Sequence, residues 1–185
     1  MPAISTRLQQ GLGVDRPLLR VGVRVSLYDE VSEQFFGRTW CSELHDVPNA
    51  GRASTVDVSL GESAFYHTRV VDDTCYAIVE VVAEVSVPGD PAPSRTCALG
   101  WTTVSAFPPP ANTPIDLGSC PGNNILLYGG SPRILLTLNK PIREVPFDRY
   151  ALPGCLLEYR LHQHDPLADA QHLIRELVCP VPTWL

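Results

Sequence analysis

The sequence predicts an all-β protein, an antiparallel β-sandwich of seven or eight strands followed by one C-terminal helix. Three observations support this prediction. Several segments alternate apolar and polar residues with a period of two, which is typical of strands with one buried face. The chain has 18 prolines and 13 glycines, and they cluster between those segments, as turn-forming residues do. One stretch near the C-terminus has helical spacing instead.

The strongest strand prediction covers residues 19–28, where an aliphatic side chain occupies every odd position from 19 to 27. Residues 75–87 form the longest predicted strand, and apolar residues on both of its faces indicate a central position in a sheet. Residues 97–106 follow, with Leu99 and Trp101 predicted on one face. The other predicted strands cover residues 56–60, 65–70, 125–128, 133–138 and 155–162.

The chain divides into three predicted parts. Residues 1–17 lack periodicity and are expected to form an irregular lead-in. Residues 18–164 hold the predicted strands and form the sandwich. Residues 165–185 hold the helix and a tail, with Asp165 as its cap and Pro166 in its first turn, and we expect them to lead to further domains of a longer protein.

Charge excludes one class of function and weakens another. The net charge is −6, and Lys140 is the only lysine among 14 basic residues. Nucleic-acid binding needs a dense basic face that releases phosphate counterions, and scattered arginines do not supply one. Binding of lipid headgroups through a polybasic patch is disfavoured for the same reason.

Cysteine spacing and the start of the chain favour a reduced, cytoplasmic protein. The six cysteines are widely separated, and no pair has the C-x-x-C spacing of a zinc knuckle or a redox site. Met1 is not followed by a basic stretch and a long apolar run, so we expect no secretory signal. Cys75, Cys97 and Cys155 fall on the apolar phase of predicted strands, where thiols act as small hydrophobes.

The sequence predicts no enzyme, no cofactor and no metal. None of the patterns G-x-S-x-G, G-x-x-x-x-G-K-[ST] or G-x-G-x-x-G occurs, so nucleophile elbows and nucleotide loops are not indicated. His162 and His164 share a strand face, and His172 or Cys179 could complete a zinc site with them. Nothing in the spacing selects those further ligands, and exposed histidines near a strand end are the favoured interpretation.

Four segments, in the same order along the chain, resemble the N-terminal domain of the nephrocystin-4 family. RVSLYD at 24–29 with FFGRTW at 35–40 is the first, and FYHT at 65–68 with IVEVVAE at 78–84 is the second. LYGGSPR at 127–133 with the leucine pair at 135–136 is the third, and CLLEY at 155–159 with HDPL at 164–167 is the fourth.

The resemblance implies an eight-stranded β-sandwich of the C2 type and a non-enzymatic scaffold role. It implies a place on the cytoplasmic side of the cilium base, at the transition zone and basal body, associated with the cytoskeleton. There the module would mediate protein–protein assembly in ciliogenesis and in gating of ciliary protein content. Expected partners are other transition-zone proteins such as nephrocystin-1 and the RPGR-interacting-protein family. The alternative is a calcium-independent, membrane-binding C2 domain.

Calcium binding is not expected, although many C2 domains use that ion. Calcium takes six to eight oxygen ligands, mostly from carboxylates on facing loops. Asp29, Glu30 and Glu33 follow the first strong strand, but the segment 83–86 after the central strand holds no Asp-x-Asp pair. We therefore interpret these carboxylates as a solvated loop.

Two clusters are the candidate partner-binding residues. Aromatic and arginine side chains often anchor protein interfaces, but large aromatics are also common core residues. We weigh both roles for each cluster. The candidates are Phe35, Phe36, Arg38 and Trp40, together with Tyr128 and Arg133 around a Gly-Gly turn.

Overall fold

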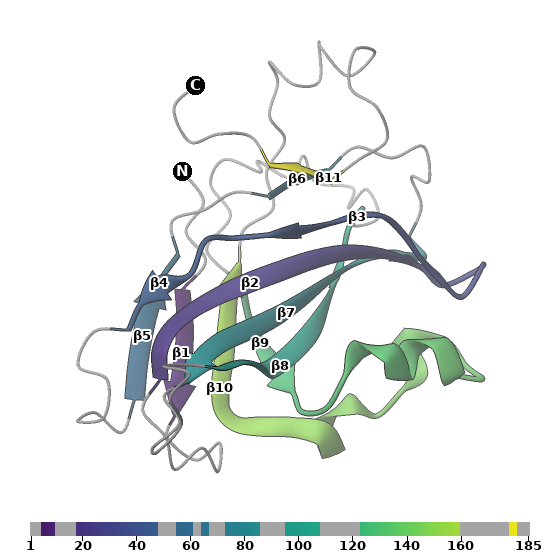
Figure 1. Ribbon diagram of the computed structural model, residues 1–185. Helices are drawn as coiled ribbons and strands as arrows, with labels where there is room; N and C mark the ends of the chain where they lie inside the picture. Colours follow the sequence, from purple (N-terminus) through teal and green to yellow (C-terminus); the bar gives the residue numbers. More distant parts are fainter. Residues whose placement is uncertain are drawn as a thin grey trace.

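The structure, a computed structural model, describes residues 5–9, 18–47, 55–60, 64–66, 73–85, 95–107, 123–159 and 178–180. These residues form strands and three short 3-10 helices (Figure 1). In chain order they are β1 (Ser5–Gln9), β2 (Leu18–Asp29), β3 (Gln34–Cys41), β4 (His45–Asp46), β5 (Thr55–Ser59), β6 (Ala64–Tyr66), β7 (Cys75–Val85), β8 (Arg95–Ser105), β9 (Asn123–Tyr128), η1 (Pro132–Thr137), η2 (Ile142–Glu144), η3 (Phe147–Tyr150), β10 (Ala151–Tyr159) and β11 (Val178–Pro180).

The strands pair into one large antiparallel sheet and one small one. Among the described residues, the large sheet has the order β3-β2-β7-β8-β9-β10-β1-β5, with β4 paired to β2, and β11 pairs with β6 in the second sheet. Figure 1 shows the long strands β2 and β7 arching across the view, while β10 and β1 run steeply. The all-β, antiparallel class is confirmed. The eight-stranded C2-type sandwich is not, and it stays a prediction.

One face of the bent sheet encloses the main core. The alternation read from residues 19–28 puts Val21, Val23, Val25 and Leu27 on this face, all with at most 5% of their surface exposed. Odd positions of β7 face the same way, and Leu127, Cys155 and Leu157 from β9 and β10 join them, each fully buried. Burial of each such side chain contributes roughly 1.5–3 kcal/mol, so this cluster holds the two halves of the sheet together.

The central position predicted for residues 75–87 is confirmed. β7 pairs along its length with β2 on one side and with β8 on the other. Val79 and Val81 are buried in the main core, while Ile78 is buried in a second cluster on the opposite face. Both faces of β7 are therefore covered around Ile78, which explains why its sequence shows no simple alternation there.

A bulge in β8 overturns one expectation about side-chain direction. Val81 pairs with Gly100 and Val82 pairs with Ala98, so Leu99 is an extra residue without a partner in the register. Leu99 packs into the main core and Trp101 into the opposite cluster, so the prediction of one shared face was wrong. A bulge shifts the phase of alternation by one residue. A Cβ at Gly100 would lie 2.8 Å from Cδ1 of Leu152, so only glycine fits there without a shift.

The predicted strand at residues 133–138 was wrong, because the segment forms the 3-10 helix η1. Ser131 caps this helix by accepting a hydrogen bond from the backbone N–H of Arg133, and Pro132 stands in its first turn. Serine followed by proline is a strong helix start. The apolar residues that resemble a strand instead serve one buried contact, through Leu135, while Leu136 stays 46% exposed.

The two ends of the chain also depart from expectation. Within the predicted irregular lead-in, Ser5–Gln9 forms β1, which pairs with both β5 and β10. Residues 165–177 of the predicted C-terminal helix lie outside the described residues. Val178, within the segment predicted as helix and tail, belongs to β11, which pairs with β6. The division of the chain into three parts stays a prediction.

Tyr66 ties the small sheet to the large one. Its hydroxyl donates a hydrogen bond of 2.8 Å to the carbonyl of Ala106, just beyond β8, and its ring meets Phe107 edge-on at 5.9 Å. Burial raises the pKa of the Tyr66 hydroxyl to about 12, with smaller contributions from Cys75 and Tyr159. The neutral phenol is therefore the form that the folded chain holds.

We expect Thr102→Val to stabilise the protein by about 1 kcal/mol. The Thr102 side chain is fully buried, and its Oγ1 has no hydrogen-bond partner among the described residues. An unsatisfied buried hydroxyl costs roughly 1–3 kcal/mol, and valine has nearly the same shape without it. Urea denaturation measures the change. Thr39→Val is the control, since that exposed hydroxyl is bonded to Ser26 at 2.9 Å; an equal gain in both variants would contradict the prediction.

We expect alkaline pH to weaken the contact made by Tyr66. The pKa of about 12 in the folded chain lies above the ordinary tyrosine value of 10.0, so the stabilising contribution is complete below pH 10.0 and is lost as the pH rises towards 12. The difference between these two pKa values corresponds to a loss of stability of up to ~3 kcal/mol. Between pH 8 and pH 12, the free energy of unfolding measured in urea should fall more steeply for the natural chain than for Tyr66→Phe. Parallel pH profiles for the two chains would contradict it.

Candidate interaction surface

The sheet face opposite the main core, here called the outer face, is covered at one end and open at the other. The cover is formed by residues 131–150, which contain η1, η2 and η3 and are called the cap. In Figure 1 the cap lies at the lower right, where the chain continues from β9. β7 carries apolar side chains on both faces. The main core buries those on one face, and the cap buries those on the other.

An aromatic cluster lies between the outer face and the cap. Trp101 meets Phe147 edge-on at 5.5 Å and Tyr128 at 5.6 Å, and Tyr128 stacks on Phe147 at 5.1 Å. On β2, Tyr28 meets Phe35 of β3 at 5.1 Å. Such aromatic pairs contribute about 0.5–1.5 kcal/mol each beyond the area they bury. The cap is thus packed on a rigid floor.

Three hydrogen bonds from side chains fasten the cap and its borders. The hydroxyl of Tyr28, 2% exposed, donates to the carbonyl of Leu135 at 2.9 Å. The indole N–H of Trp101 donates to the carbonyl of Gly129 at 3.3 Å. The carboxylate of Glu30 accepts a hydrogen bond from the backbone N–H of Ile142. These bonds join β2 and the β2–β3 hairpin to the cap, and β8 to the turn that precedes it.

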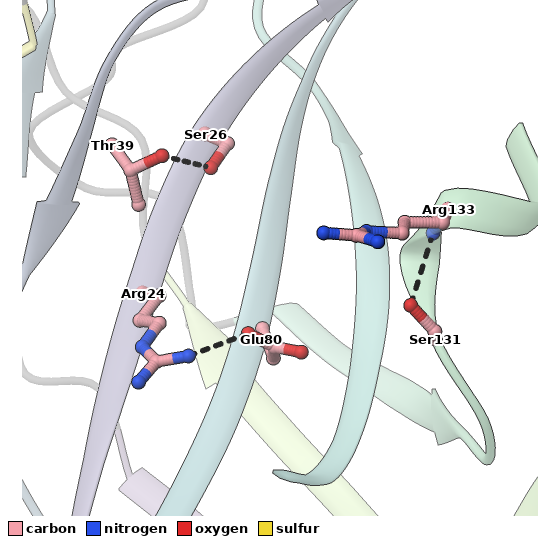
Figure 2. Close-up of polar contacts among 6 residues, drawn as sticks. All are labelled: Arg24, Ser26, Thr39, Glu80, Ser131 and Arg133. Atoms are coloured by element: carbon pink, nitrogen blue, oxygen red, sulfur yellow. Dashed lines mark hydrogen bonds and ion pairs between the residues drawn. The ribbon is translucent and has the colours of Figure 1, made fainter. Parts of the chain in front are cut away.

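The open end of the outer face is charged. Registers across five strands align Cys41, Arg24, Glu80, Trp101 and Tyr128 in one row, so a charged half leads directly into the aromatic cluster. The Arg24 guanidinium lies 3.5 Å from the Glu80 carboxylate (Figure 2). Such exposed pairs add little stability, and their charges stay accessible to a partner.

A second ion pair stands further along the same two strands. The Arg20 guanidinium lies 2.5 Å from the Glu84 carboxylate, and the Arg20 side chain is 45% exposed. The hydrogen bond and the charge of Glu84 raise the pKa of Arg20 above its ordinary value. The open end of the outer face therefore presents two arginines, each next to a glutamate.

Exposed apolar side chains surround the cap. Val31 at the tip of the β2–β3 hairpin is 76% exposed, Leu136 of η1 is 46% exposed and Tyr150 of η3 is 43% exposed. Lys140 and Arg143, both exposed, lie between η1 and the end of η2. Exposed apolar groups beside unpaired charges are the usual constituents of a protein contact surface.

The predicted cluster on β3 is divided by the structure. Trp40 is 5% exposed and belongs to the main core, and Phe36 packs against the same core. Phe35 faces the other way, onto Tyr28, because successive strand residues point to opposite faces. Arg38 stands exposed in an irregularity of β3 next to Gly37, whose φ of +70° favours glycine. Only Arg38 of these four presents its side chain freely to solvent.

The second predicted pair, Tyr128 and Arg133, lies at the border of the cap. Tyr128 is half-buried in the aromatic cluster, and burial followed by the charge of Asp148 raises the pKa of its hydroxyl. Arg133 is exposed, and Figure 2 shows its side chain extending from η1 toward the strands that carry Arg24 and Glu80. The structure thus brings Arg133 and the charged row to one side of the sheet, while Arg38 stands on the edge strand.

Sequence reasoning missed the residues that build the floor and the cap. Trp101 and Tyr28 were interpreted as strand residues, and Phe147 and Tyr76 were not singled out. The available signal was the apolar pattern on both faces of residues 75–87, which requires a second covering layer. Phe147 anchors the cap on the sheet, but the sequence alone does not distinguish it from other aromatic residues, because the strand pairing that places Trp101 and Tyr128 beneath it is not visible there.

Two of the three carboxylates considered for calcium, those of Asp29 and Glu30, have structural roles. Asp29 accepts hydrogen bonds from the N–H groups of Val31 and Ser32 and so shapes the hairpin turn. Glu30 binds the backbone of Ile142, and Glu33 has a φ of +52° in the same turn. No group of three or more metal-ligating side chains occurs in the part of the chain that the structure describes. The alternative zinc residues His162 and His164 lie outside it.

Within the described ranges, no helix has the length and apolar character needed to cross a bilayer.

The fold defines an antiparallel all-β protein with a capped outer face. The chain is similar to human nephrocystin-4, with 28% identity over 178 residues, which cover 88% of this chain and 12% of that protein. It is also similar to nephrocystin-4 of Xenopus laevis, with 28% identity over 159 residues, 84% of this chain and 11% of that protein. No family model matches. The resemblance found in the four segments is confirmed, and the chain spans about an eighth of the length of these relatives.

We expect Tyr28→Phe to lower the free energy of unfolding by about 1 kcal/mol, because the carbonyl of Leu135 loses a buried donor. Hydrogen exchange should quicken at the backbone of η1 more than in β2, since the bond holds the cap to the strand. Urea denaturation and exchange measured by mass spectrometry check both parts. Tyr150→Phe, at a 43% exposed position, is the control and should change neither quantity.

Proposed function

We propose that the chain is a non-enzymatic interaction module of a nephrocystin-4-like scaffold. The observation that carries the proposal is the similarity to nephrocystin-4 over 88% of the chain, with the capped outer face as the contact surface. The proposed setting is the cytoplasmic side of the cilium base, at the transition zone and basal body. The proposed partners are nephrocystin-1 and the RPGR-interacting-protein family.

The contact surface proposed here combines charged and apolar groups around the cap. Arg38 and Arg133 remain proposed contact residues, because both side chains are exposed. Phe35 and Tyr128 are half-buried on the outer face and support the surface from beneath, whereas Phe36 and Trp40 pack in the main core on the other face of the sheet. Leu136 adds an exposed apolar group on η1. Interfaces usually take most of their binding energy from a few such side chains at the centre of the contact.

A C2-type sandwich is part of this proposal, and it raises the alternative of calcium-independent membrane binding. Two features disfavour that alternative. The net charge of −6 opposes an anionic membrane. The arginines of the outer face stand beside glutamates, at 2.5 Å for Arg20 and 3.5 Å for Arg24, which reduces their attraction for lipid headgroups.

The test is direct binding of the purified chain to purified nephrocystin-1 and to a purified RPGR-interacting protein, measured by biolayer interferometry. We expect Leu136→Asp to weaken binding about tenfold or more, because a charge replaces a contact side chain on the cap. Leu126→Asp is the comparison: it is the same substitution at a 37% exposed position of β9 outside the cap, and it should weaken binding less than Leu136→Asp does.

Two results would contradict the proposal. One is the absence of binding to both proteins at physiological salt. The other is sedimentation of the chain with phosphatidylserine vesicles in the absence of calcium, together with no protein binding, which would favour the membrane alternative.

A further inference from the structure

A hollow opens between the outer face and the cap, apart from the exposed apolar groups. It has a volume of about 290 Å³ and lies where β7, β8 and β9 meet η2 and η3. Its polar and aromatic lining comes from Tyr76, Thr103, Tyr128, Arg143, Phe147 and Asp148. The volume suits one long side chain from a partner rather than a drug-sized ligand.

Aromatic rings form the floor of the hollow. Phe147 is 6% exposed and stacks on Tyr128, with ring planes 30° apart, so these two rings are held in place by the cluster beneath. Tyr76 and Tyr128 are half-buried, and Thr103 lies between them on β8. Aromatic rings attract cations through their π-electron faces, and the hydroxyls add hydrogen-bond acceptors.

The lining of the hollow carries one carboxylate, Asp148, and one guanidinium, Arg143, and two carboxylates outside the lining also act on Tyr76. Burial raises the pKa of the Tyr76 hydroxyl, Glu30 and Asp73 raise it further, and Arg143 lowers it. The pKa of the Tyr128 hydroxyl is raised by burial first and by the negative charge of Asp148 second. Three carboxylates therefore act on the two tyrosines against one guanidinium, in a chain whose net charge is −6.

We propose that this hollow binds an arginine side chain presented by a basic segment of a partner protein. The planar guanidinium would lie against the aromatic floor and donate hydrogen bonds to the Asp148 carboxylate and the Thr103 hydroxyl. A lysine ammonium lacks the planar face, and a glutamate would meet the carboxylates. The inference rests on the proposed function, since it names the chemistry that the interaction module recognises.

The first experiment varies the ligand and leaves the chain unchanged. The isotope-labelled 185-residue chain is titrated with acetyl-Gly-Arg-Gly-amide and followed by two-dimensional NMR. We expect shifts at the amides of Tyr76, Thr103, Tyr128 and Phe147. The matched peptide with citrulline, a neutral analogue of arginine, should bind about tenfold more weakly, because it lacks the charge that strengthens both kinds of contact.

The second experiment varies the chain. Asp148→Asn should weaken binding of the arginine peptide about tenfold. Glu144→Gln is the matched control, since it removes the same charge from an exposed position of η2 that does not line the hollow. Arg143→Gln should strengthen binding, because it removes the one cation at the site.

Four outcomes of the peptide experiments would overturn the inference, and three of them concern relative affinities. They are equal binding of the arginine and citrulline peptides, tighter binding of a matched glutamate peptide, and equal weakening by Asp148→Asn and Glu144→Gln. Absence of any shift at the highest soluble peptide concentration also overturns it. If a partner protein binds the natural chain and Asp148→Asn equally well, the proposed function stands and the arginine site is contradicted. The failure of the site is therefore distinguishable from the failure of the proposed function.

Discussion

The burial of β7 on both faces is the constraint on which the rest of the described structure depends. Val79 and Val81 face the main core, and Ile78 faces the aromatic cluster under the cap. A strand with two apolar faces cannot remain on the surface of a two-layer protein, so a third layer is needed over its second face. The three 3-10 helices supply this layer, and the outer face and hollow exist because they cover only one end.

Much of the fold was predictable from the sequence, because alternation is set by strand geometry alone. The strict pattern of residues 19–28 predicted both the strand and its buried face. The long apolar segment 75–87 predicted a central strand. The failures have a different physical origin. β1 has little local signal and is selected by its two neighbours, and η1 carries a strand-like run of apolar residues behind a Ser-Pro helix start.

The candidate surface was less predictable than the fold, because surfaces are assembled by register. Adjacent residues Phe35 and Phe36 were treated as one cluster, yet they contribute to opposite cores. Trp101 and Tyr128 meet because β8 and β9 pair at that point, far apart in sequence. Arg38 and Arg133 were predicted as contact residues, and both are exposed, as charged residue types usually are. The hollow depends on Phe147 and Asp148, whose positions follow from the path of the cap.

The bulge at Leu99 limits where the chain can change its length. Loss of one residue between Trp101 and Val104 would put Val104 on the same face as Trp101, away from the main core. Loss of Leu99 itself would join the pairs Val81–Gly100 and Val82–Ala98 into an uninterrupted register. Insertions and deletions among related chains should therefore gather at this one point of the strand, which otherwise admits substitutions but no gaps.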